Sequence, residues 1–151
     1  MTSKVQEAPK STEGLDGIVA GDSAISTVGL GLGLNYRGYN IIDLAKNCIF
    51  EEVIHLLIFG TLPVEKQLAD LRQRISKLRK LPAVLVKVLE ALPKESNCMD
   101  VMRTISSVLG ILEPETETND QVNIALRLMA VFGPALNYWY HFSHNGKRIK
   151  T

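Results

Sequence analysis

The chain has 151 residues, of which 46% are hydrophobic, and this length is sufficient for one domain with a single buried core. Its 17 basic and 16 acidic residues leave a formal net charge of +1, so the overall charge gives no reason to expect binding to nucleic acid or to an anionic membrane. The 2 cysteines are too few for a disulfide scaffold and predict a protein of the reducing cytoplasm.

The first part of the chain changes character near residue 15. Residues 1–14 are polar and contain few apolar side chains, which predicts a disordered tail and neither a secretory signal nor a membrane anchor. Residues 15–151 are predicted to fold as one unit. Short β-branched or aromatic runs at 15–20, 24–28 and 34–37 are separated by glycines and predict small strands in a hairpin-like arrangement.

The segment from Phe50 to Gly60 carries apolar side chains around nearly its whole helical circumference. This pattern predicts a central, buried helix with neighbours on several sides. Glu51 and Glu52 suit the positive end of its dipole, and Gly60 provides a left-handed stop. Apolar periodicity and capping residues predict the other helices at 41–47, 64–80, 83–92, 99–112 and 120–144.

The helix predicted at 64–80 differs from the others because basic side chains cover most of its surface. At about 100° per residue, Arg72 and Arg79 lie on one flank of the apolar seam and Arg74 lies on the other. One interpretation is a solvated face whose long side chains cover hydrophobic neighbours. The other is an anion-binding site, because the planar guanidinium group can bind two oxygens of a phosphate or carboxylate at once.

Residue types alone do not identify a catalytic group. His55 lies within the predicted buried helix, where a lone histidine is typical of a hydrogen-bonded core residue. His141 and His144 are three residues apart, but no carboxylate or cysteine has the spacing that would complete a metal site with them. The glycines between Gly29 and Gly33 lack the lysine and the following helix of a phosphate-binding loop. No metal site and no nucleotide cofactor are therefore predicted.

Several separated blocks of the chain resemble citrate synthases in order and spacing. They include Tyr36-Arg-Gly-Tyr39, Phe50-Glu-Glu-Val53, Val88-Leu-Glu-Ala-Leu-Pro93 and Met99-Asp-Val-Met-Arg-Thr104. The block from Tyr138 to Gly146 is similar in particular to the 2-methylcitrate synthase branch of that family. The resemblance covers residues 15–151 and implies a mainly α, multi-helical fold with a small β hairpin near the N-terminus.

What the resemblance implies about activity is a carbon–carbon condensation. Propionyl-CoA, or acetyl-CoA more weakly, would add to oxaloacetate, and hydrolysis of the thioester would give 2-methylcitrate or citrate. The CoA thioester is a substrate, so no separate cofactor is implied. The chain would supply the N-terminal part of the large helical domain, with the catalytic histidines and aspartate and the small domain outside it. We therefore expect this segment alone to be inactive, with Arg74 or Arg79 as its candidate contacts to a CoA phosphate or a substrate carboxylate.

Self-association is predicted at the helices of residues 83–112. Serines 106 and 107 permit a close helix crossing, Arg103 has no predicted partner, and the family resemblance implies a two-fold dimer through large-domain helices. An alternative from a different functional class stays open: a non-catalytic helical interaction module that uses the same surface.

Overall fold

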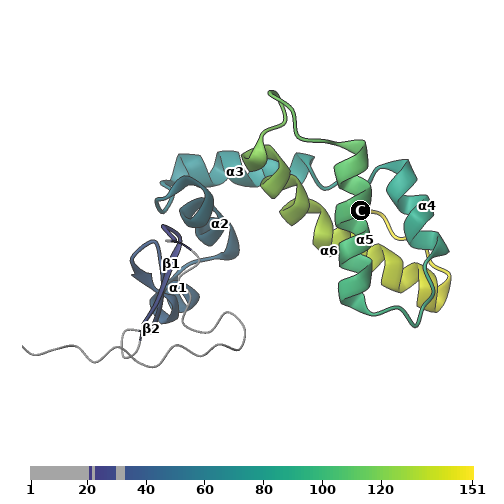
Figure 1. The fold of residues 1–151 in the computed structure, drawn as a ribbon, viewed down its shortest axis with the longest axis horizontal. Helices are drawn as coiled ribbons and strands as arrows, with labels where there is room; N and C mark the ends of the chain where they lie inside the picture. Colours follow the sequence, from purple (N-terminus) through teal and green to yellow (C-terminus); the bar gives the residue numbers. More distant parts are fainter. Residues whose placement is uncertain (1–20, 22, 30–32) are drawn as a thin grey trace, which may run out of the picture.

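The computed structural model describes residue 21, residues 23–29 and residues 33–151, so the predicted tail and the predicted strand at 15–20 lie outside the described residues. In the described part, three short strands precede six helices (Figure 1). The prediction of a mainly α, multi-helical fold with a small β element near its N-terminus is confirmed. The elements are β1 (Ser26–Gly29), β2 (Gly33–Tyr36), β3 (Tyr39–Asn40), α1 (Ile41–Asn47), α2 (Phe50–Phe59), α3 (Glu65–Lys77), α4 (Ala83–Ala91), α5 (Cys98–Leu112) and α6 (Gln121–Asn145).

The sheet is an antiparallel meander in the order β1-β2-β3, and β3 has no counterpart among the predicted strands. Tyr36 pairs with Tyr39 across a two-residue turn in which φ is 49° at Arg37 and 88° at Gly38. Positive φ at both positions is the backbone of a type I′ turn, which an arginine rarely adopts. The Arg37 guanidinium donates a hydrogen bond to the Leu57 carbonyl oxygen at 3.1 Å, so this unusual residue ties the sheet to the end of α2.

Side-chain caps and glycines set the helix ends close to where the sequence predicts them. The Asn97 side chain accepts a hydrogen bond from the Met99 N–H at the start of α5, and Asp120 accepts one from Asn123 at the start of α6. Gly60 ends α2 in the left-handed region with φ of 88°, and Gly146 ends α6 with φ of 63°. These caps satisfy backbone groups that the helix itself leaves unpaired.

The larger hydrophobic core lies among α4, α5 and the second half of α6, on the right of Figure 1. Trp139 is the largest fully buried side chain in it, with 1% of its surface exposed. Burial of whole apolar side chains of this kind is the main favourable contribution to folding. The buried members are Leu81, Leu85, Leu89, Val101, Ile105, Leu109, Val131, Ala135, Tyr138 and Trp139.

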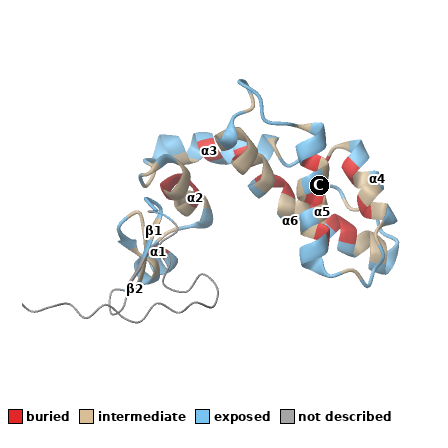
Figure 2. Ribbon diagram, viewed as in Figure 1, coloured by how far each residue is buried: buried red, intermediate tan, exposed pale blue. Residues whose placement is uncertain are grey.

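A smaller cluster joins α2, α3 and the first half of α6, and it corrects the prediction that α2 is central. Ile54, His55 and Leu56 are buried, but Phe50 is 70% exposed and Phe59 is 44% exposed. Figure 2 accordingly shows only part of α2 in red. In this structure α2 packs mainly against α3, and Ile54, with the partly buried Ile58 beside it, joins α2 to the cluster that also contains Leu126 and Ala130 of α6. The prediction of a buried helix therefore holds for the middle of α2, which contacts α3, α6 and the sheet, and fails for Phe50 and Phe59 at its two ends.

Helix α6 connects the two cores because it contributes to both of them. Leu126 and Ala130 in its first half belong to the smaller cluster, and Ala135 and Trp139 in its second half belong to the larger one. The sheet, α1 and α2 lie at one end of the molecule, and α4 and α5 lie at the other (Figure 1). None of the helices in the described ranges is long and apolar enough to cross a membrane.

Candidate functional site

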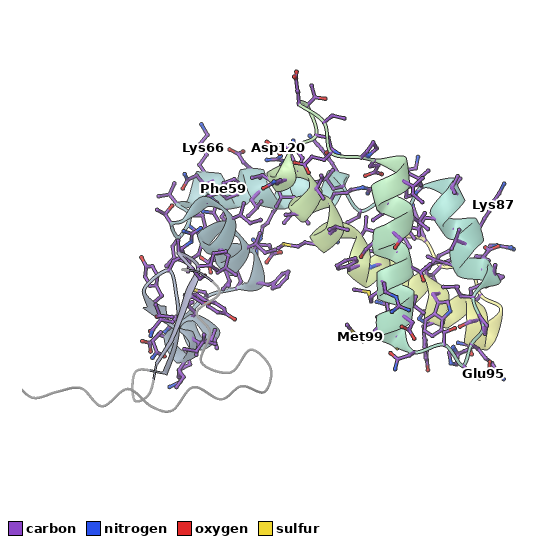
Figure 3. All side chains as sticks on the ribbon, viewed as in Figure 1. Phe59, Lys66, Lys87, Glu95, Met99 and Asp120 are labelled. Carbon is purple, nitrogen blue, oxygen red and sulfur yellow. The ribbon has the colours of Figure 1, made fainter. Side chains whose placement is uncertain are left out.

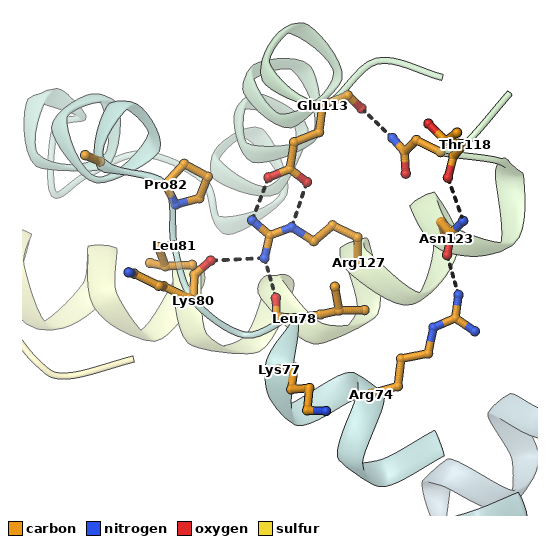
Figure 4. Close-up of a pocket in the computed structure, with 12 residues that line it drawn as sticks. Arg74, Lys77, Leu78, Lys80, Leu81, Pro82, Glu113, Thr118, Asn123 and Arg127 are labelled. Atoms are coloured by element: carbon orange, nitrogen blue, oxygen red, sulfur yellow. Dashed lines mark hydrogen bonds and ion pairs between the residues drawn. The ribbon is translucent and has the colours of Figure 1, made fainter. Parts of the chain in front are cut away.

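A cleft of about 800 Å³ opens where the end of α3, the start of α4 and the loop between α5 and α6 meet (Figure 4). Arg74, Lys77 and Lys80 line it, and among the described residues no carboxylate lies within ion-pair distance of any of the three. The first turn of α4 also faces this cleft, without a capping side chain or an acidic residue. The positive charge of these groups suits an anionic ligand.

Arg127 forms the wall of this cleft and was not among the predicted site residues. Its guanidinium donates two hydrogen bonds to the Glu113 carboxylate, each 2.7 Å long. It also donates to the carbonyl oxygens of Leu78 and Lys80, the second at 3.0 Å. Only 14% of the Arg127 side chain is exposed. Arg127 therefore holds the loop after α3 against the junction of α5 and α6, and its own charge is neutralised.

Arg74 lies at the edge of the same cleft. Its guanidinium donates a hydrogen bond to the side-chain oxygen of Asn123, near the start of α6. This contact uses one amino group, and the rest of the fork remains available to an anion in the cleft. Arg74 therefore contacts a neighbouring helix and also lines a positively charged cavity.

Arg79 lines a different cavity, so the structure does not bring the two predicted arginines together. Helix α3 ends at Lys77, and the helical-wheel position predicted for Arg79 no longer applies beyond that point. Its cavity has a volume of about 470 Å³ and lies between α2, α6 and the C-terminal segment, where Phe50, Asn137 and Ile149 also line it. Among the described residues that line it, Arg79 and Lys150 are the cationic groups, and the one carboxylate side chain, that of Glu51, pairs with Arg72. Since most of the other lining residues are apolar, the cavity suits a ligand with an acyl or other apolar part beside an anionic group.

The three histidines make hydrogen bonds and aromatic contacts with neighbouring residues of the fold. His55 is 7% exposed and its Nδ1 lies 2.7 Å from the Thr61 carbonyl oxygen, which confirms the prediction of a hydrogen-bonded core histidine. His144 stacks on Tyr140 with 4.3 Å between ring centroids, and the ring of His141 lies edge-on to the same tyrosine. The described residues contain no group of three or more histidine, cysteine, aspartate or glutamate side chains arranged to hold a metal ion.

A second ion pair joins Glu90 to Arg148 at the surface beside the larger core, with 20% of the Glu90 side chain and 67% of the Arg148 side chain exposed. Glu90 of α4 accepts hydrogen bonds from Arg148 and from the Tyr138 hydroxyl. The Arg148 contact, followed by the Tyr138 contact, lowers the pKa of Glu90 from 4.5 to about 2. Burial and the Glu90 carboxylate raise the pKa of Tyr138. Because the lower pKa belongs to the folded state, the stabilisation from this pair is complete above pH 4.5 and is lost as the pH falls toward 2.

Comparison with known proteins gives the family. The family model described as citrate synthase, C-terminal domain, matches residues 14–151. The chain belongs to the citrate synthase family. It is 50% identical to a 2-methylcitrate synthase of Shewanella oneidensis over 139 residues, which are 91% of this chain and 37% of that protein. It is also 37% identical to citrate synthase 2 of Bacillus subtilis over 79% of this chain and 33% of that protein.

The solved structures of citrate synthases agree with this assignment. The fold matches the crystal structure of citrate synthase from Thermotoga maritima with a TM-score of 0.79 and 29% identity, over 94% of this chain and 37% of that one. It also matches citrate synthase from Thermoplasma acidophilum, solved in a ternary complex with carboxymethyl coenzyme A and oxaloacetate, with a TM-score of 0.77 and 18% identity. That match covers 95% of this chain and 38% of the other. The chain therefore spans little more than a third of the length of these citrate synthases.

One signal in the sequence of this citrate synthase family member could have identified Arg127. It is the only Lys, Arg, Asp or Glu within the 25 residues of α6. A lone charge in an otherwise uncharged helix indicates a specific partner, because burial without one is costly. The partners themselves are far away in the sequence, at Leu78, Lys80 and Glu113, and no local pattern identifies them.

Proposed function

We propose that this chain is part of an enzyme that condenses propionyl-CoA with oxaloacetate and water to give 2-methylcitrate and CoA, and more weakly forms citrate from acetyl-CoA. The observation that carries this proposal is the 50% identity to a 2-methylcitrate synthase over 91% of the chain. A further support is the likeness in fold to an enzyme solved with carboxymethyl coenzyme A and oxaloacetate. The decisive assay compares turnover of propionyl-CoA and acetyl-CoA by the full-length enzyme, and propionyl-CoA should be preferred.

The reaction needs groups that we assign to parts of the enzyme beyond these residues. A carboxylate must remove a proton next to the thioester carbonyl, and hydrogen-bond donors must stabilise the resulting enol and polarise the ketone of oxaloacetate. His55 already uses its Nδ1 to contact Thr61, and His141 and His144 contact Tyr140. No catalytic role is therefore assigned to any of them, and the 151-residue chain alone should show no turnover.

Two arginines are the candidate substrate contacts, and each lines its own cleft. We expect Arg74→Ala or Arg79→Ala in the full-length enzyme to raise the KM for one of the two substrates by about tenfold or more, the typical effect of losing a hydrogen bond to a charged group. Arg72→Ala is the matched control for Arg74, because Arg72 lies on the same helix, its side chain is 53% exposed, and its only ion pair among the described residues is the one with Glu51 at 3.9 Å. Unchanged KM values for both substrates in both variants would leave these arginines with structural roles only.

The second part of the proposal is a homodimer through residues 83–112. On α5, Met99 is 73% exposed and Ile111 is 79% exposed, and the small residues Ser107 and Gly110 lie between them on the same face. Figure 3 shows Met99 projecting from the end of α5 away from α4. Large apolar side chains around small ones are typical of a close helix crossing. Arg103 is not unpaired as predicted, because it bonds Asp100 of its own helix at 3.0 Å.

We expect Ile111→Glu in the full-length enzyme to sediment as a monomer, because it would bury a carboxylate at the interface. Val108 is a poorer test position, since it packs against the larger core within one chain. Ile42→Glu is the control: Ile42 is 58% exposed, but it lies on α1 at the other end of the molecule. An intact dimer for both Ile111→Glu and Ser107→Arg would contradict the proposed interface.

We place the enzyme in the cytoplasm and propose that it uses no cofactor, because the CoA thioester is a substrate. Cys48 and Cys98 are both free thiols, which supports a reducing compartment.

A further inference from the structure

The last five residues fold back along α6 instead of continuing it. Gly146 reverses the chain with φ of 63°, and its N–H and that of Lys147 bond carbonyls of the last turn of α6. Ile149 then packs against the larger core. Ile149, Lys150 and Thr151 together line the second cleft, the one that contains Arg79. This segment therefore forms part of a cavity wall far from the helix end where it begins.

One carboxylate holds the segment at Arg148, the second of its five residues. The Arg148 guanidinium donates from Nε to one oxygen of Glu90 at 2.7 Å and from a terminal nitrogen to the other at 2.9 Å. The Tyr138 hydroxyl donates to the first of these oxygens at 2.7 Å. Arg148 also lies over the Phe142 ring, 5.1 Å from its centroid. A two-point fork of this kind fixes the direction of the arginine as well as its position.

We propose that Glu90 is a positioning residue that, through Arg148, latches the segment 147–151 against α6 and so builds one wall of the second cleft. Glu90 does not line that cleft itself, and it acts only through the segment that it holds. The inference goes beyond the proposed function, because it holds whether or not Arg79 binds a substrate.

The charges around Glu90 predict that acid releases the segment 147–151 from α6. Arg148 on the segment and Tyr138 on α6 are the ionisable groups that face its carboxylate, and both donate hydrogen bonds to it. Both contacts favour the ionised form and keep the pKa of Glu90 low, so the latch stays closed at neutral pH. Protonation toward pH 2 removes the charge that holds Arg148.

The test uses trypsin on the 151-residue chain, because Lys147 and Arg148 provide cleavage sites within the latched segment. Glu90→Gln leaves the segment unchanged in sequence and should speed cleavage after these two residues by about fivefold or more, since local opening controls proteolysis of a held segment. Asp100→Asn is the matched control, because it removes the exposed Asp100–Arg103 pair of 3.0 Å without touching the segment. Its cleavage rates at Lys147 and Arg148 should equal those of the wild type.

Cleavage after Arg103, inside α5, distinguishes a latch from general loosening of the fold. It should stay at the wild-type rate in Glu90→Gln. Unchanged cleavage at the segment, or an equal acceleration at Arg103, would overturn the proposal. If Glu90→Gln does not fold, Tyr138→Phe provides the second variant: it keeps the ring in the core, removes only the third hydrogen bond to Glu90, and should give a smaller but selective acceleration at the segment.

Discussion

Replacing Trp139 by alanine is expected to lower the free energy of unfolding by about 3–5 kcal/mol, the usual cost of removing a fully buried large aromatic side chain. Trp139 is 1% exposed and lies at the centre of the larger core, where α4, α5 and α6 meet. The cavity left behind could not collapse easily, because Ala135 and Val131 on the same helix are themselves fully buried. Urea denaturation followed by circular dichroism measures the change, since the variant lacks the only tryptophan.

Two further variants sharpen this expectation. The Trp139 Nε1 atom is buried and has no hydrogen-bond partner among the described residues, so Trp139→Phe removes a buried polar group as well as some volume. Its cost should therefore be clearly smaller, at about 1–2 kcal/mol. Ile42→Ala is the control, with an expected change within about 0.5 kcal/mol because Ile42 is 58% exposed and lies outside the proposed dimer interface. A Trp139→Ala cost no larger than that of Ile42→Ala would contradict the position of the core.

Helix boundaries were the part of the fold most accessible from the sequence, because the signals are local. Asn97 and Asp120 cap α5 and α6 with their own side chains, and Gly60 and Gly146 stop α2 and α6 by adopting positive φ. Each signal acts within four residues of the boundary that it sets. The Arg37–Gly38 turn shows the limit, because a type I′ turn normally uses asparagine or glycine where this chain has arginine.

The position of α2 could not be predicted for a different physical reason. Apolar side chains around a helix indicate how much surface it must cover, but not which element covers each side. The exposed Phe50 and the buried Ile54 look equally apolar in the sequence, and only the placement of α3 and α6 separates them. The same limit applies to the site. The predicted positions of Arg74 and Arg79 assumed that one helix contains both residues, but α3 ends before Arg79.

Replacing Arg127 by methionine is expected to lower the free energy of unfolding by about 2–3 kcal/mol, because the change leaves partly buried acceptors without a donor. The Glu113 carboxylate, 34% exposed, would lose both of its hydrogen bonds from Arg127. The carbonyl oxygens of Leu78 and Lys80 would lose theirs too. Arg127→Lys should recover only part of the loss, since an ammonium group cannot reproduce the planar fork that reaches three segments.

Arg103→Ala is the matched control, because Arg103 is 79% exposed and, within the part of the chain that the structure describes, forms an ion pair only with Asp100 of its own helix. Its removal should change the free energy of unfolding by less than about 0.5 kcal/mol. The comparison also separates a structural role for Arg127 from ligand binding. If Arg127 held a substrate anion, Arg127→Met would raise KM and leave stability nearly as it is for Arg103→Ala. We expect the opposite, because Glu113 already neutralises the Arg127 charge, whereas Arg74, Lys77 and Lys80 leave theirs available to a ligand.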